Sequence, residues 1–461
     1  MKNINARIER IPDNRYNKKL LSQTGLGYIY DTLDGTLLSF VLPVVAGVWA
    51  LSSQQTGVLG SSLFIGYLFG TLFSGYLADR FGRKKIIMFT LVVYSLATLL
   101  SAFATNWGFF FWARVIAGFG TGGEAAIIAP YLSELISSKF RGRYTGLLTG
   151  FFAIGNICAG LVSYFIVPLW DNGWRVAIFI SALPIFMIIV WRRHLPESPR
   201  WLEHKGRYEE ADKEMTKIEE QAEKYLKRKL PEPEFENSVE VIPEKTSILT
   251  LFSKQYAKRT IMLWLLWFAI MYVNFGFLTW LPTLLVKQGF EIASSFLYSI
   301  IIYIAQVPGY LLSAFLLDKI GRKLTLMIGM ICAIISALCM GFASIAFTVV
   351  LFGACMSCFM TMSIGVIYAY TPEQFPTAIR TTGMGSTSGF SRFGSILAPI
   401  VIGAIYPLYG FTGVFIMLTA VLICGALVVL VLGSETKNKS LDEVTEQMES
   451  SKGEPYKTNH L

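Results

Sequence analysis

The sequence predicts an all-α membrane protein with twelve transmembrane helices in two pseudo-repeated six-helix bundles. Of the 461 residues, 53% are hydrophobic and only 15% are charged, and the mean hydropathy is +0.52. Twelve apolar stretches approach or exceed the 20 or so residues that an apolar helix needs to cross the hydrocarbon layer. Finally, a polar pattern returns at a fixed spacing: Asp79 and Asp318 lie 239 residues apart, and so do Glu134 and Glu373.

The apolar stretches define the order of the predicted helices. The first six are 21–48, 57–78, 86–104, 108–135, 144–168 and 175–195. The second six are 259–286, 293–317, 324–343, 348–371, 381–406 and 411–433. The domains we expect are therefore a first bundle (1–195), a polar central loop (196–258), a second bundle (259–433) and a polar tail (434–461). Repeated halves of this kind place a cavity at their interface near the middle of the membrane, an architecture that moves solutes.

The distribution of basic residues predicts the orientation in the membrane. The formal net charge is +9, and Lys and Arg gather at the N-terminus and in every second loop. This is the positive-inside bias, so we expect a multi-pass protein of the cell membrane with both termini and the central loop in the cytoplasm. The basic balance reflects topology, and we expect no nucleic-acid partner.

The motifs of enzymes and metalloproteins are missing or misplaced. Residues 118–123 fit the dinucleotide pattern GxGxxG, but they lie inside a predicted membrane helix with no preceding strand. No GxxxxGK[ST] loop occurs, and the six cysteines all fall inside predicted spans without the spacing of metal ligands. We therefore expect no enzyme activity, cofactor or metal, and transport driven by a gradient rather than by ATP.

Charged residues inside the spans are the strongest indication of function, because a charge at bilayer depth is costly and lines a cavity or has a partner. Five such residues are present: Asp31, Asp34, Arg114, Glu124 and Arg392. Asp31 and Asp34 share a helix face, and two adjacent carboxylates do not both ionise readily. None of the three histidines lies in mid-membrane, so Asp31, Asp34 and Glu124 are the predicted proton-coupling residues. The alternative is a static salt bridge, such as Asp34 with an arginine, and Arg114 has a structural or coupling role.

Arg392 is the predicted substrate residue. An arginine facing a cavity of low dielectric attracts a carboxylate and can hold it with two parallel hydrogen bonds. The alternative is that Arg392 only neutralises Asp31 or Asp34. Polar and aromatic residues of the spans complete the predicted pocket, and aromatic faces suit a flat ring. They are Tyr272, Asn274, Trp280, Gln306, Tyr368 and Asn156.

The repeated loops between spans are predicted gates. Asp79 and Arg83 follow the second span, where Asp79 can meet the dipole of the next helix, and Asp318 and Arg322 repeat them. Further charge partners come from two repeated pairs: Glu134 with Arg141, and Glu373 with Arg380. We expect these networks to latch the cytoplasmic side while the cavity faces outward.

Three motifs resemble known transporters. Residues 79–84 (DRFGRK) resemble the signature loop of the major facilitator superfamily, 114–118 (RVIAG) its fourth-helix motif, and 196–200 (PESPR) a segment of sugar-porter-like members. Residues 368–380 and 389–394 are similar to bacterial niacin transporters and their organic-anion relatives, as are 277–282. Residues 31–35 (DTLDG) resemble the acidic motif of aromatic-acid:proton symporters, with a different residue order. The resemblance implies the major facilitator fold, proton-linked uptake of nicotinate or a similar carboxylate, and contact between Arg392 and the anion.

We therefore predict a monomeric, proton-coupled secondary transporter that imports a small organic acid, nicotinate or another aromatic carboxylate. Two rival transport functions are sugar or polyol uptake with protons and drug efflux by proton exchange. A hexose is disfavoured because 271–276 (MYVNFG) lacks the Gln-rich motif of sugar porters. A rival of another class is a non-transporting membrane sensor that signals through 196–258. The expected partners are a small carboxylate, the proton and the lipid bilayer.

Overall fold

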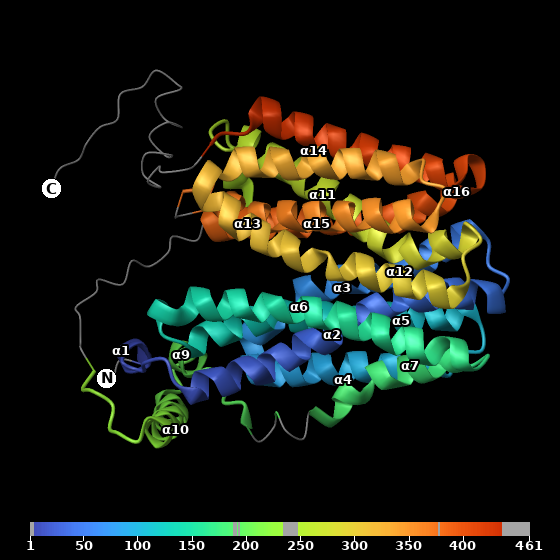
Figure 1. The fold of residues 1–461 in the computed structure, drawn as a ribbon. Coiled ribbons are helices and arrows are strands. Elements are labelled where there is room, and N and C mark those ends of the chain that lie inside the picture. Colours follow the sequence, from blue (N-terminus) through green and yellow to red (C-terminus); the bar gives the residue numbers. More distant parts are fainter. Residues whose placement is uncertain (1–3, 188–190, 192–193, 234–247, 377–378, 436–461) are drawn as a thin grey trace. The chain divides into compact units, whose positions relative to one another are not determined.

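The computed structural model describes residues 4–187, 191, 194–233, 248–376 and 379–435, and their regular structure is helical throughout. The chain forms two compact units. The first unit comprises Met1–Ala50 and Ser62–Glu240, and the second comprises Leu51–Ser61 and Val241–Leu461. Figure 1 shows the order of the helices along the chain.

Six apolar helices account for the predicted spans of the first half. They are α2 (Arg15–Val48), α3 (Ser53–Phe81), α4 (Arg83–Ala102), α5 (Trp107–Leu135), α6 (Ser138–Ile166) and α7 (Gly173–Ser181). The short turns η1 (Val167–Leu169) and η2 (Leu183–Phe186) follow α6 and α7. Pro184 lies in η2 and has no backbone N–H to donate, which explains the change to a tighter helix after α7. The sixth predicted span, 175–195, continues past η2 into residues 188–190 and 192–193, which lie outside the described part of the chain.

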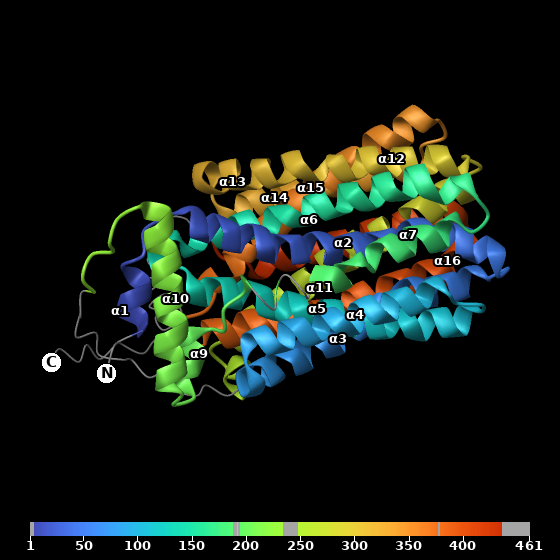
Figure 2. The same cartoon turned by 90° about the horizontal axis from the view of Figure 1, so that it is seen from below.

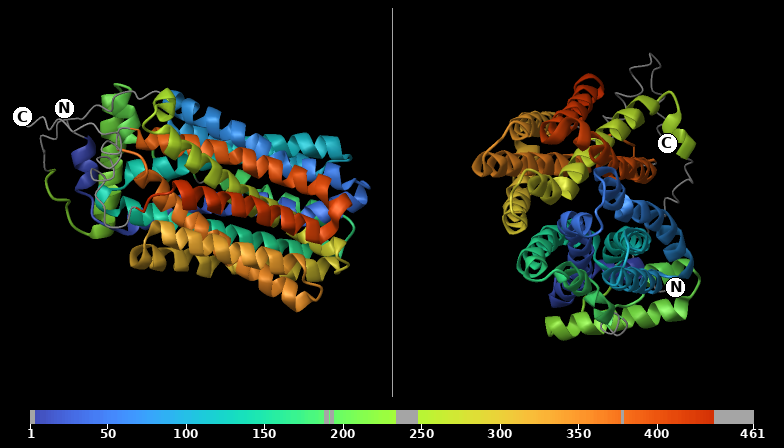
Figure 3. Two further views of the ribbon diagram at one scale, coloured as in Figure 1. Left: turned by 90° about the horizontal axis from the view of Figure 1, so that it is seen from above. Right: turned by 90° about the vertical axis from the view of Figure 1, so that its right-hand side faces the viewer.

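The second unit repeats this arrangement. Its helices are α11 (Ala257–Lys287), α12 (Ile292–Ile304), α13 (Gln306–Ile320), α14 (Arg322–Gly341), α15 (Ala346–Glu373) and α16 (Arg380–Leu432), preceded by η3 (Ile248–Phe252). Helices α12 and α13 together make the eighth predicted span. The long helices of each unit run side by side in the left panel of Figure 3.

The number of spans agrees with the prediction once the break in α16 is taken into account. A straight helix of its 53 residues would be about 80 Å long, far more than a bilayer needs. Gly410 has φ 63° and ψ −157° inside it, a left-handed backbone that breaks the helix into the predicted spans 381–406 and 411–433. With this break, the ten long apolar helices and the shorter apolar stretch Gly173–Phe186 make twelve spans within the described residues. The prediction of an all-helical, twelve-span membrane protein is confirmed.

Glycines set the closest contacts between helices of the first unit. A Cβ at Gly66 or Gly70 of α3 would overlap the backbone oxygens of Val115 or Phe119 on α5. Such small residues allow membrane helices to approach until backbone meets backbone. At Gly146 and its repeat Gly385, by contrast, an added Cβ would meet nothing within 4 Å. Gly150 and Gly389, each four residues further on, have the same open space, so these glycine pairs do not mark a tight helix contact.

The central segment forms a small helical layer at one end of the first unit. It consists of α9 (Pro199–His204) and the amphipathic α10 (Tyr208–Leu226), joined by a short N-terminal helix α1 (Ile4–Glu9) that the sequence did not predict. Figure 2 shows α10 running across the ends of α2 to α5. The face of α10 that carries Ala211, Met215 and Ile218 is buried. Residues 234–247 of the predicted central loop and residues 436–461 of the predicted tail lie outside the described residues.

Candidate functional site

A closed ion-pair network lies in the core of the first unit. Asp34 of α2 and Arg114 of α5 are both 1% exposed. Arg114 donates from Nη2 to Asp34 Oδ2 at 2.5 Å and from Nη1 to Oδ1 at 3.1 Å, a bidentate geometry. Thr98 of α4 and Ser181 of α7 donate to the same Oδ1 at 3.3 and 2.9 Å. Four helices thus meet at one carboxylate.

The partner that the sequence suggested for Asp34, an arginine on another helix, is Arg114. Thr98 and Ser181 were not predicted, because a hydroxyl on an apolar helix is common and gives no signal of its own in a single sequence. Arg114 and Glu124 are ten positions apart along α5, so they do not pair, and Arg114 binds Asp34 of α2 instead.

A second pair of carboxylates, Asp31 and Glu124, lies near this network but does not take part in its hydrogen bonds. Asp31 is 8% exposed and Glu124 is fully buried. None of their four carboxylate oxygens has a hydrogen-bond partner among the described residues. Glu124 lies over Gly27, one turn before Asp31, where a Cβ would come within 2.5 Å of Glu124 Oε1.

Carboxylates in such surroundings do not stay ionised without a counter-ion, because a buried, unpaired charge is very costly. The chemistry open to Asp31 and Glu124 is therefore uptake and release of a proton.

Arg392 lies on α16 in the second unit, between two phenylalanines that belong to an aromatic cluster. The rings of Phe390 and of Trp264 on α11 stack with centroids 4.5 Å apart and an interplanar angle of 14°. Phe393 packs at 5.9 Å from Phe390. Arg392 itself is half-buried, and Gly389, on the same side of the helix one turn earlier, has open space beside it. Phe390 precedes Arg392 by two residues, so the aromatic stack and the guanidinium leave α16 on different sides of the helix.

The other predicted pocket residues are found in varied surroundings. Trp280 is fully buried and donates its indole N–H to Pro399 O at 3.0 Å, so it joins α11 to α16. Tyr272 is buried and directs its hydroxyl to Met417 Sδ at 3.3 Å. Asn274 is half-buried and Gln306 is buried, whereas Tyr368 is half exposed and packs edge-on against Trp267.

Asn156 belongs to the first unit. Its Oδ1 accepts a hydrogen bond from Thr36 at 2.6 Å, which joins α6 to α2.

The predicted gate residues form the same ion pair twice. Arg83 donates from Nε to Glu134 at 3.2 Å and also binds Asp79. In the repeat, Arg322 donates from Nη2 to Glu373 at 2.9 Å and from Nε at 3.1 Å.

The remaining predicted gate residues are placed as follows. Arg141 lies 4.0 Å from Glu9 of the N-terminal helix, and Arg380 donates to Pro372 O at 3.1 Å. The side chain of Asp318 lies outside the described part of the chain.

Two carboxylates that the sequence analysis left out complete these loops. Glu197 accepts from the backbone N–H of Lys84 at 3.0 Å, at the N-terminus of α4. Glu435 does the same for Arg322 and Lys323 at the start of α14, both at 2.9 Å. A carboxylate there satisfies free N–H groups and opposes the helix dipole. Burial raises the pKa of the Glu197 carboxyl, and the N–H donors offset only part of that rise.

The repeat could have revealed both residues. Glu197 and Glu435 each follow the last span of their half and lie 238 residues apart, one short of the spacing of the loops.

Comparison with known proteins identifies the family. Residues 10–448 match the family described as "Sugar (and other) transporter". The chain belongs to this family of the major facilitator superfamily. It is therefore a multi-pass membrane protein and a secondary transporter of a small molecule rather than an enzyme.

Three similar proteins illustrate the range of the family. The niacin transporter NiaP of Acinetobacter baylyi is 39% identical over 444 residues, which cover 95% of this chain and 99% of the relative. The benzoate transport protein of the same organism is 26% identical and covers 87% and 86%. The xylose transporter XylE of E. coli has a TM-score of 0.73 at 19% identity, with 94% of this chain and all of that chain covered. XylE at this identity supports the fold alone.

Proposed function

We propose that this chain is a proton-coupled importer of a small aromatic carboxylate, with nicotinate as the first candidate. The observation that carries this proposal is Arg392, a half-buried guanidinium inside an apolar span. A guanidinium holds a carboxylate, the charged part of nicotinate, with paired hydrogen bonds. The 39% identity to a niacin transporter and the similarity to a benzoate transport protein support the same class of substrate.

On this proposal Arg392 binds the carboxylate of the substrate. Asn274, half-buried on α11, would recognise the ring nitrogen with its amide. Tyr272, Gln306 and Tyr368 of the same unit would line the remaining surface. Trp280 would act by packing, because its only polar hydrogen is already bound to Pro399.

Proton coupling is assigned to the carboxylates of the first unit. Asp31 and Glu124 lack hydrogen-bond donors among the described residues, so each would exchange a proton as its exposure to water changes. Asp34 is held by Arg114, and protonation of Asp34 would release that arginine and weaken the contact of α2 with α5. A proton taken up at one of these groups would thereby alter helix packing, which is what coupling requires.

The repeated Arg–Glu pairs would serve as gates on the cytoplasmic side of the membrane. Arg83–Glu134 and Arg322–Glu373 each fix the loop between two spans to the end of another helix. We assign these loops, with both termini, to the cytoplasm, because Lys and Arg gather in them. The membrane would then be the cell membrane.

The test is uptake of labelled nicotinate into proteoliposomes that contain the full chain, with and without an inward proton gradient. We expect accumulation only with the gradient, and competition by benzoate. Glucose and a cationic dye are measured alongside to test for sugar uptake and drug efflux. No transport of nicotinate or benzoate under either condition would refute the proposal.

Variants localise the activity to the proposed site. Arg392→Ala should abolish uptake, and Arg392→Lys should retain part of the binding, because lysine keeps the charge without the paired donors. The matched control is Phe347→Leu, a 71% exposed side chain at the start of α15 outside the aromatic cluster. Normal uptake by Arg392→Ala, with transport by the wild type intact, would remove the substrate role of Arg392 alone.

A further inference from the structure

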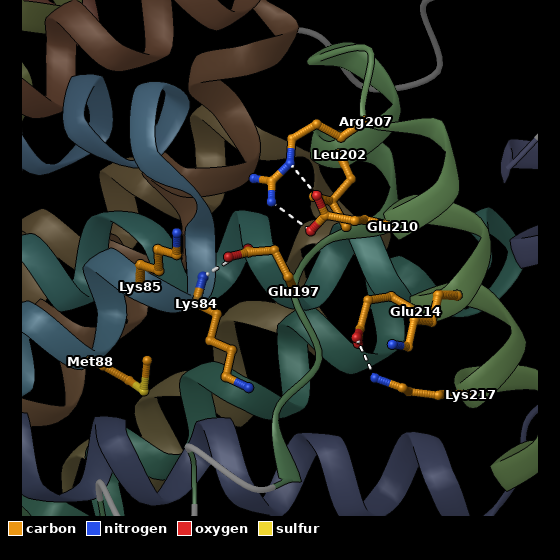
Figure 4. A pocket seen from close by; sticks show the side chains of 10 residues that line it. Lys84, Lys85, Met88, Glu197, Leu202, Arg207, Glu210, Glu214 and Lys217 are labelled. Carbon is orange, nitrogen blue, oxygen red and sulfur yellow. Dashed lines mark hydrogen bonds and ion pairs between the residues drawn. The ribbon is translucent and has the colours of Figure 1, made fainter.

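A cavity outside the transport site lies where α4 meets the layer of α9 and α10. Its volume is about 360 Å³, and its lining comes from the first turns of α4, from Glu197 and Leu202, and from one face of α10. Figure 4 shows Lys84 and Lys85 of α4 on one side and Arg207 and Lys217 on the other. All of these elements belong to the first unit.

Positive charge dominates this cavity. Its cationic lining residues are Lys84, Lys85, Arg207, Lys213 and Lys217. Three carboxylates, of Glu197, Glu210 and Glu214, also line it, so the formal excess is two positive charges.

The carboxylates of the cavity are already engaged. Glu210 accepts two hydrogen bonds from Arg207, at 2.8 and 2.5 Å, and Glu214 accepts one from Lys217 at 2.6 Å. Glu197 is bound to the backbone of α4. Lys85 and Lys213, which come from different elements, make no ion pair or hydrogen bond with any residue of the described chain. Two ammonium groups therefore remain available to an anion in the same cavity.

The position of the cavity in the membrane narrows the class of anion. Lys84 and Lys85 begin the apolar helix α4, so they lie at the end of a membrane span. Met88, one turn further along, lines the cavity and gives it an apolar part. Phe81 and Phe89, on either side in sequence, are 48% and 49% exposed, as expected of side chains that face lipid. An anion here meets lysines at headgroup depth and hydrocarbon directly beside them.

We propose that this cavity binds a phosphate group, and that an anionic membrane lipid supplies it. The headgroup phosphate would contact Lys85 and Lys213, and the acyl chains would lie along α4 past Phe89. Clusters of Lys and Arg at the end of a span attract anionic headgroups, and each such charge near the surface strengthens the attraction about fivefold. A free phosphate ester offers the same group without the acyl chains.

The test compares the full-length wild type with Lys85→Gln/Lys213→Gln. The control is Lys205→Gln/Lys224→Gln, which removes the same charge from positions of the same layer that do not line the cavity. Retention of phosphatidylglycerol against phosphatidylcholine is measured by native mass spectrometry. Thermal stabilisation by glycerol phosphate and by inorganic phosphate is measured separately.

The expected result is a roughly 25-fold loss of phosphatidylglycerol affinity in the cavity variant and less than about a twofold loss in the control. In another outcome, the cavity variant loses the stabilisation by glycerol phosphate or inorganic phosphate but retains the lipid as the wild type does. The cavity would then be a phosphate site, and a soluble phosphate ester rather than a lipid would be its ligand. Equal behaviour of the two variants in both measurements would overturn the proposal. None of these measurements depends on transport.

Discussion

Arg7 holds the N-terminal helix against α10, and its removal should loosen the helical layer. Its guanidinium is buried and donates to both oxygens of Glu219, at 2.9 and 2.6 Å, and to Thr216 and Asp212. Ile4 and Ile8, on either side of it, are buried in the same cluster of side chains. We call the contact of residues 4–11 with α10 the N-terminal clasp.

The magnitude follows from the burial of the pair. The side chains of Arg7 and Glu219 are 7% and 10% exposed, and removing one partner of a buried pair costs about 3–5 kcal/mol. Arg10 stays bound to Glu219 at 2.7 Å, so the carboxylate is not left alone in Arg7→Met. We therefore expect a loss of about 2 kcal/mol, the range of one hydrogen bond between charged groups. This corresponds to roughly 30-fold faster amide exchange in α1 and α10.

Hydrogen exchange of the full chain in detergent, read by mass spectrometry over 4–14 and 208–226, measures this loss. The control is Arg207→Met, which breaks an exposed ion pair at the N-terminus of α10 that should contribute only about 0.3–0.5 kcal/mol, or roughly a twofold change. Similar exchange in the two variants would refute the argument from burial.

The same contact predicts a dependence on pH. Burial alone would raise the pKa of Glu219, but the hydrogen bonds from Arg7 and Arg10 hold it below 4.5. The pKa of Glu9 is lowered as well: burial opposes the shift, and hydrogen bonds from Ser138 and Ser137 outweigh it. Such groups bind fewer protons in the folded state, so the clasp is at full strength above about pH 4.5 and weakens as the pH falls through their folded pKa values. Exchange corrected for its intrinsic pH dependence should be constant from about pH 8 to 5 and faster below about 4.5. Constant protection down to about pH 3 would contradict this.

Three further predictions concern the spans and their ends. Arg114→Gln leaves the charge of Asp34 buried and should cost about 3–5 kcal/mol in thermal unfolding, and adding Asp34→Asn should recover most of it; a double variant as unstable as the single one would contradict the pairing. Gly66→Ala should cost about 2 kcal/mol by overpacking, whereas Gly142→Ala, where nothing lies within 4 Å, should lower the melting temperature by no measurable amount. Glu435→Gln should speed exchange in the first turn of α14 about fivefold, because the cap loses its charge, and unchanged exchange there would exclude a capping role.

The architecture could be predicted from the sequence because the membrane restricts which segments can cross it. A span must be apolar over about 20 residues, so hydropathy alone located the spans, although α2 and α6 each begin six residues before the predicted starts at 21 and 144. The break at Gly410 separated two spans that the composition already distinguished. The helix α1 was missed because six residues with three polar side chains give no periodic signal, and its stability depends on the tertiary contact of Arg7 with α10.

The site was predictable in its parts but not in its pairings. Asp34 and Arg114 could be singled out because charges are rare inside spans, yet nothing in their spacing of 80 residues says that they meet. The pair forms because α2 and α5 pack in the same bundle, which only the three-dimensional structure reveals. Its hydroxyl donors, Thr98 and Ser181, are ordinary residues of apolar helices until the fold directs them at one carboxylate.

Asp34 and Asp31 lie one turn apart on α2 but have different surroundings, which is a physical argument for different roles. The carboxylate of Asp34 accepts from four donor groups on three other helices, two of them from Arg114, so its charge has a partner. Asp31, one turn earlier on the same helix, has no donor among the described residues, and neither has Glu124, which packs over Gly27. A movement of α2 would break the hydrogen bonds of Asp34, whereas no such bond holds Asp31 among the described residues. If proton coupling resides here, Asp31→Asn should therefore impair accumulation while exchange of substrate across the membrane continues, whereas loss of Asp34 should affect both.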